Sequence, residues 1–143
     1  MIKDNKGQIS LEYLLIFAVS LILLIAFTLP LLEFGLENTM DLSNSLNAKS
    51  ELSKLSNSIS QVYGEGQGSR QTIYITLNKP VDVKITSSYI SAVFKLSDGK
   101  NKQLKLNHNS NLNSGSLFLD KGENKIIVEW PVGSEKMSVF KKY

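Results

Sequence analysis

The chain has 143 residues, of which 42% are hydrophobic and 20% charged, a length that allows one modest folded domain and one further element. Its formal net charge is +3, but the basic residues are single lysines and one arginine without a basic run, which argues against nucleic-acid binding. Cysteine is absent, which excludes disulfides, thiolate metal ligands and cysteine nucleophiles.

An uncharged apolar run covers residues 13–32, with the sequence YLLIFAVSLILLIAFTLPLL. At a rise of about 1.5 Å per residue, a helix of this length matches the ~30 Å of a bilayer core. The run predicts a transmembrane helix. A buried helix of a soluble core is the alternative, but such a helix usually keeps a polar stripe, and this run has none.

The orientation of this helix follows from Lys3 and Lys6, which precede it and favour a cytoplasmic N-terminus. A cleaved secretory signal is the main competing interpretation. However, the run is longer than the apolar region of such signals, and no small-residue cleavage site follows it at residues 31–34. We therefore expect most of the chain to lie outside the cell.

A short polar motif stands immediately before the apolar run. The stretch KGQISLEY holds Lys6, Gly7, Gln8, Ser10, Glu12 and Tyr13. It resembles the class III signal peptide of archaeal type IV pilins, with the pattern Q-x-S-x-E-Y that is typical of methanogens. All positions of that pattern are matched. The resemblance is detailed over residues 6–13 and general over the helix to about residue 62.

The resemblance implies a specific maturation. A membrane-embedded prepilin peptidase would cut between Gly7 and Gln8, removing residues 1–7 as a leader and keeping the apolar helix. The mature subunit would leave the cell membrane to polymerise with copies of itself into an extracellular type IV-like pilus for surface adhesion. An assembly ATPase and a membrane platform protein are the further partners that the resemblance implies.

Glu12 is a carboxylate at the border of the apolar run. Such a charge costs up to about 2.5–3.5 kcal/mol at the centre of a bilayer and less near its surface. Glu12 is either hydrated at the headgroups or, in a dry bundle of helices, paired with a cation such as the new α-amino group of Gln8. If Gln8 cyclises, the hydroxyls of Ser10 and Tyr13 are the local donors. We expect Glu12 to act in assembly.

The second half of the predicted helix, residues 36–63, is amphipathic. Leu52, Leu55, Ile59 and Val62 are spaced 3, 4 and 3 residues apart, so they share one face, which we expect to be core rather than partner surface. Pro30 and Gly35 predict a kink or a melted turn within residues 26–36. In a pilin bundle, Pro30 would let the helix bend or stretch during assembly. A kink without function in a simple membrane anchor is the alternative.

The remainder changes from helical to strand-like periodicity. A glycine-rich linker is predicted at residues 64–70, and an extracellular β-domain at residues 71–143. Its strands are expected at residues 71–77, 81–85, 89–96, 102–106, 116–119, 124–130 and 136–140. The predicted fold is α+β: a hydrophobic helix at residues 8–35 continues as the amphipathic helix, which packs on an antiparallel sheet or small β-sandwich.

Catalytic and cofactor motifs are not found in the sequence. The single histidine, His108, lies in an Asn-rich stretch and is expected to be a solvated loop residue. Phosphate-binding glycine motifs and Asn-x-Ser/Thr sequons are absent. We expect no enzyme activity, no cofactor and no metal. Three functions stay open: a structural pilin, a minor pilin or adhesin of such a filament, and a non-polymerising membrane protein with an extracytoplasmic binding domain.

Overall fold

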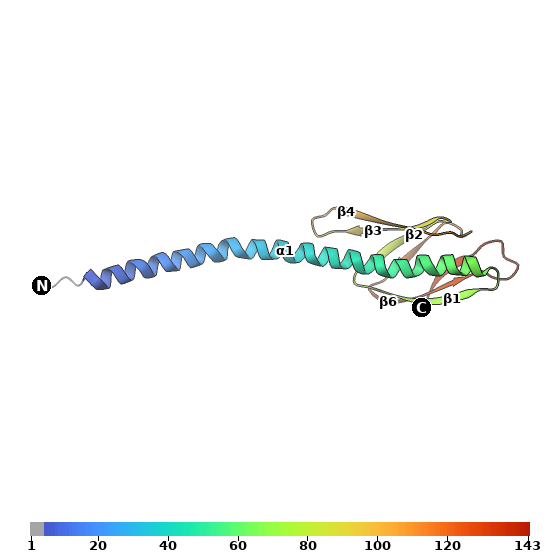
Figure 1. Ribbon diagram of the computed structural model, residues 1–143, viewed down its shortest axis with the longest axis horizontal. Coiled ribbons are helices and arrows are strands. Elements are labelled where there is room, and N and C mark those ends of the chain that lie inside the picture. The colour runs from blue at the N-terminus through green and yellow to red at the C-terminus, as the bar shows by residue number, and fades with distance from the viewer. Residues whose placement is uncertain (1–4) are drawn as a thin grey trace. The chain divides into compact units, whose positions relative to one another are not determined.

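The computed structural model describes residues 5–143, with side chains described from residue 10 onward. One helix precedes seven strands: α1 (Asn5–Glu65), β1 (Arg70–Leu77), β2 (Val81–Ile85), β3 (Tyr89–Lys95), β4 (Asn101–Asn107), β5 (Gly115–Leu119), β6 (Gly122–Glu129) and β7 (Ser138–Lys142) (Figure 1). The predicted α+β fold is confirmed. The chain divides into two compact units, a helical unit that ends at Thr39 and a second unit, the head, formed by Met40–Tyr143.

The seven strands form two antiparallel sheets in the head. One has the order β1-β6-β7 and the other β4-β3-β2-β5. The pairing of β1 with β6 joins segments about 50 residues apart, from Arg70 opposite Glu129 to Leu77 opposite Gly122. Strand β2 shows how the sequence selects its faces, because buried Val81, Val83 and Ile85 alternate with two exposed charged residues.

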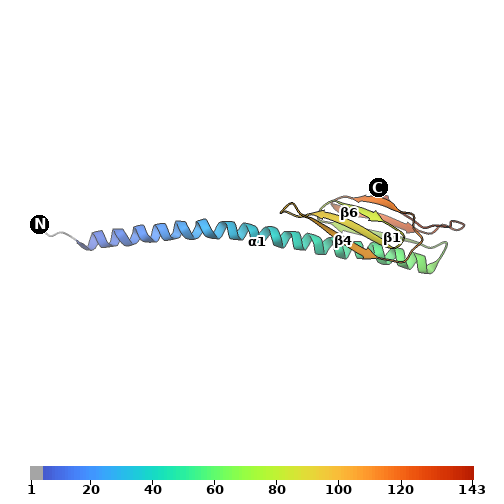
Figure 2. The ribbon, with the colours of Figure 1, turned by 90° about the horizontal axis from the view of Figure 1, so that it is seen from above.

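The helical face predicted from its 3-4-3 spacing is the centre of the head's core. Leu52, Leu55, Ile59 and Val62 are at most 1% exposed, so the expectation of core rather than partner surface is confirmed. They pack in one hydrophobic cluster with side chains of both sheets, including Ile75, Val83, Ile90, Leu119, Ile126 and Val128. Figure 2 shows the last turns of α1 running along the strands.

The junction between helix and sheet is shorter than the predicted linker at residues 64–70. Helix α1 continues to Glu65, and β1 already begins at Arg70. Gly64 stays helical, whereas Gly66 has a φ of 88° and its N–H donates to the carbonyl of Val62 at 3.1 Å. This left-handed cap needs a glycine, so the helix ends at the second glycine of the stretch and not at the first.

The other strands lie within two residues of their predicted bounds, and the position of β7 and the course of α1 also differ from the sequence prediction. Strand β7 was expected at residues 136–140 but spans Ser138–Lys142. A turn occupies the residues before it, in which the Ser134 hydroxyl donates to the Lys136 carbonyl at 2.7 Å. In the helical unit, α1 is helical through Pro30 and Gly35, so the alternative of a melted turn is wrong for this described stretch. Proline lacks a backbone N–H, so only one helical hydrogen bond is lost at Pro30. The neighbouring apolar residues favour helix and keep the other hydrogen bonds of this stretch.

Candidate functional site

The signal motif lies at the beginning of α1, on the helical unit. Ser10, Glu12 and Tyr13 are exposed, Tyr13 by 70%. The side chains of Lys6 and Gln8 lie outside the described residues, as do residues 1–4 of the predicted leader. Cleavage between Gly7 and Gln8, and pairing of Glu12 with the new amine, therefore stay predictions.

The helical unit presents apolar side chains on all sides. Between residues 11 and 36, its large hydrophobic side chains are 45–72% exposed. An 18-residue stretch of α1 has a mean hydropathy of 2.8 and none of it is buried, so this helix is long and apolar enough to cross a membrane. A surface of this size and composition needs lipid or other helices around it.

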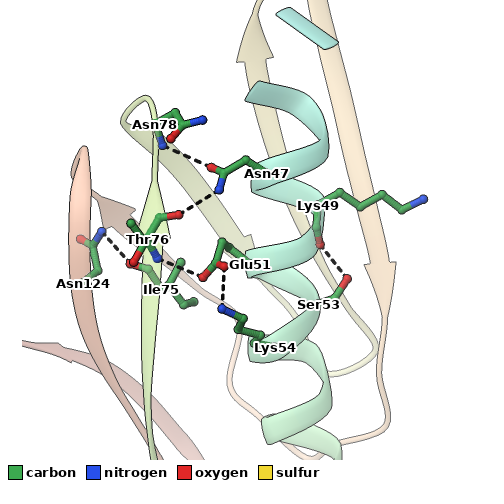
Figure 3. Close-up of polar contacts among 9 residues, drawn as sticks. All are labelled: Asn47, Lys49, Glu51, Ser53, Lys54, Ile75, Thr76, Asn78 and Asn124. Carbon is green, nitrogen blue, oxygen red and sulfur yellow. Dashed lines mark hydrogen bonds and ion pairs between the residues drawn. The ribbon is translucent and has the colours of Figure 1, made fainter. Parts of the chain in front are cut away.

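In the head, polar side chains of α1 bond the C-terminal end of the open edge of β1 (Figure 3). The carboxylate of Glu51 accepts the backbone N–H of Thr76 at 3.0 Å, and Asn47 donates to the Thr76 carbonyl at 3.3 Å. Asn47 also accepts the N–H of Asn78 at 3.3 Å, while Lys54 pairs with Glu51 at 2.6 Å. These bonds occupy the backbone N–H and carbonyl of Thr76, which an additional strand would need, so this end of the edge is protected against sheet extension.

Glu51 and Asp41 have lowered pKa values for related reasons. Partial burial acts to raise the pKa of Glu51, but the bonds from Lys54 and Thr76 outweigh it and hold the pKa below its usual value. The pKa of Asp41 is lowered chiefly by the backbone N–H of Ser97, which donates at 2.7 Å, and further by the Ser97 hydroxyl and by Lys79 at 3.6 Å. Both carboxylates thus fasten α1 to the strands as anions.

His108 is buried, which corrects the expectation of a solvated loop histidine. His108 is 7% exposed. Its backbone N–H donates to the Ser88 carbonyl at 2.9 Å, which holds the loop against the sheet. Neither ring nitrogen has a hydrogen-bond partner within the described residues. Burial lowers the pKa of His108, and the nearby carbonyls of Tyr89 and Thr86 offset this only in part.

The described residues contain no group of His, Asp and Glu side chains that could hold a metal ion. A cavity of about 210 Å³ lies between α1 and the turns after β1 and β3, and the only acidic residue that lines it is Asp41. Because Asp41 is already bonded to Ser97 and Lys79, this cavity offers no free acid–base pair. The most distinctive surface is therefore the signal motif with the apolar helix behind it.

Comparisons with known proteins also point to the signal motif and the apolar helix. Residues 5–31 match the family model of the class III signal peptide. The minor structural pilin EpdB of Methanococcus maripaludis is 31% identical over 71 residues, which cover 50% of this chain and 54% of that protein. The chain thus matches about half the length of this curated relative. No solved structure shows a significant match.

The predicted resemblance to archaeal type IV pilin-like proteins is confirmed by these two matches. The architecture is pilin-like as well, with one long apolar N-terminal helix followed by antiparallel sheets. Sequence reasoning located the signal motif and the apolar helix. It missed Asp41, Asn47 and Glu51, because nothing in their local sequence distinguishes a side chain that bonds a strand from one that faces water.

Proposed function

We propose that this chain is a structural pilin subunit that is stored in the cell membrane, processed by a prepilin peptidase and polymerised into an extracellular type IV-like pilus. The observation that supports this most is the class III signal peptide directly ahead of a helix whose apolar side chains are 45–72% exposed. The head buries its own core, so the exposed apolar surface is concentrated on the helical unit.

The same apolar helix accounts for both proposed locations of the chain, the membrane and the filament. In the membrane, lipid tails cover the side chains between residues 11 and 36, and cutting between Gly7 and Gln8 removes the charged leader that holds the N-terminus in the cytoplasm. In a filament, helices of neighbouring subunits replace the lipid. The assembly ATPase and the membrane platform protein supply the work of extraction, and this chain is the structural subunit on which they act.

Glu12 is the residue that we assign to assembly. It is exposed on the helical unit and stands at the border between polar and apolar residues. When apolar helices pack without water, its carboxylate needs a cation or donors, and the α-amino group of Gln8 is the nearest group that cleavage creates. Pro30 stays within an unbroken helix, and we propose that it gives the helix its capacity to bend in the filament.

A second candidate is a minor pilin or adhesin of the same kind of filament. The observation that favours it is the matched relative, which is named a minor structural pilin. Abundance separates the two roles, because a structural subunit forms the length of the filament, whereas a minor subunit is present in a few copies. A non-polymerising membrane protein is the third alternative.

The test is to purify filaments from cells that produce the chain and to quantify it against the other filament proteins by mass spectrometry. A structural pilin should be the main component, and gold-labelled antibody to the head should decorate the whole filament. Labelling confined to one end would favour the minor pilin. Absence from filaments, with all of the protein in the membrane, would contradict both.

A further inference from the structure

The acidic and basic residues of the mature chain are segregated along its length. Residues 8–39, which belong to the helical unit, contain three acidic residues and no lysine or arginine, whereas the head, residues 40–143, contains 14 basic and nine acidic residues. One part of the chain is thus an anionic helix, and the other is a cationic head. Opposite charges on two parts of one protein favour association between copies in which the helix of one meets the head of the next.

Two carboxylates on the helical unit lack compensation. Glu33 and Glu37 are four residues apart, so they lie on the same face of α1, and both are exposed. Neither forms an ion pair among the described side chains. Like charges at this spacing destabilise a helix by a few tenths of a kcal/mol. Leu36, which lies beside this pair, is 64% exposed.

A groove on the head carries matching groups. It has a volume of about 220 Å³ and is lined by Ser45, Leu46 and Lys49 of α1, Phe94 of β3, and Lys102 and Leu104 of β4. Phe94 and Leu104 are half-buried and form its apolar part. Lys49 on α1 and Lys102 on β4 are both exposed, and neither forms an ion pair within the part of the chain whose side chains are described.

We propose that this groove is an interface for a second copy of the chain, which inserts its helix at residues 33–37. Leu36 of one copy enters the apolar part of the groove in the next, while Glu33 and Glu37 face Lys49 and Lys102. A cavity of about 150 Å³ admits a benzene ring, so the groove has room for a leucine side chain. The proposal rests on the proposed polymerisation and specifies one contact within it.

This contact has a consequence for assembly. Because two different surfaces meet, it is heterologous, and a pair of copies still offers an empty groove on one copy and a free helix on the other. Such a contact propagates into an open filament and does not close as a two-fold dimer. The charges then set the axial register between subunits. Apolar helix packing alone specifies this register poorly.

The test uses disulfide cross-linking in filaments, which is clean because the chain contains no cysteine. The variant Glu37→Cys with Lys102→Cys should give a ladder of covalent multimers in non-reducing gels. The matched control is Glu37→Cys with Lys84→Cys, since Lys84 is also an exposed lysine on a strand but does not line the groove. We expect at least a tenfold excess of multimers for the first variant over the control.

A second experiment exchanges the charges. Lys49→Glu with Lys102→Glu should lower filament yield about tenfold through like-charge contact, and adding Glu33→Lys with Glu37→Lys should restore it. Equal cross-linking in variant and control, or no restoration while wild-type filaments form normally, would overturn this contact and leave the pilin function standing. A wild-type chain that is absent from filaments would overturn both.

Discussion

The face of α1 that contains Leu55 gives the sharpest test of how the head is built. Leu55 is 0% exposed in the core, whereas Leu42, on the same helix, is 55% exposed. In a fragment that begins at residue 36, Leu55→Ala should cost about 2–5 kcal/mol of unfolding free energy, because it removes transfer energy and leaves a cavity. Leu42→Ala should change it by about 0.5 kcal/mol or less.

The assay is urea unfolding followed by far-ultraviolet circular dichroism. With a slope of about 2 kcal/mol per molar urea, the Leu55→Ala midpoint should fall by roughly 1–2.5 M and the Leu42→Ala midpoint should stay near that of the unsubstituted fragment. We also expect the unsubstituted fragment to be soluble, monomeric and cooperative in its unfolding. Equal losses for both substitutions, or random-coil spectra of the unsubstituted fragment, would refute the assignment of this helical face to a self-contained core.

Three other predictions concern processing, assembly and pH. Gly7→Val should leave full-length precursor in the membrane, because a branched side chain blocks the approach of the peptidase to the backbone, and mature protein from this variant on an immunoblot would contradict it. Glu12→Ala should insert normally but form few filaments when only correctly processed protein is counted, and normal filaments would show that the carboxylate merely marks the membrane border. For His108, whose pKa in the folded state lies below its ordinary value of 6.5, the unfolded chain binds the proton more readily, so stability should fall as the pH drops below about 6.5. His108→Leu should remove this part of the pH dependence in urea titrations at pH 7.5 and 5.5, and an unchanged dependence would show that other groups cause it.

The strands could be predicted because their signals are local. Alternation at Val81, Asp82 and Val83 marks one buried and one exposed face, and turn residues mark where each strand ends. The sequence likewise predicted the buried face of α1, since a 3-4-3 spacing is a property of the helix itself. A small β-sandwich was one of the two predicted alternatives, but which strands pair in which sheet could not be predicted, because the pairing of β1 with β6 depends on contacts between residues far apart in the chain.

The polar contacts of the head were beyond sequence reasoning for the same reason. Glu51 and Asn47 resemble ordinary residues of a solvated helix face, and only the position of β1 gives them a strand edge to cover. His108 was expected in water because its neighbours are polar, yet the loop folds back and buries it together with Leu112. By contrast, the signal motif could be recognised in the sequence, because its pattern consists of neighbouring residues within positions 6–13.

The most direct test of the proposed function is the N-terminal residue of the chain in purified filaments, determined by mass spectrometry of the intact subunit and of its N-terminal peptide. We predict that the subunit begins at Gln8, as glutamine or as its cyclised form, and that residues 1–7 are missing. A filament subunit that still begins at Met1, or one that begins after the apolar run, would contradict the proposal that this helix is processed as a pilin helix and retained for assembly.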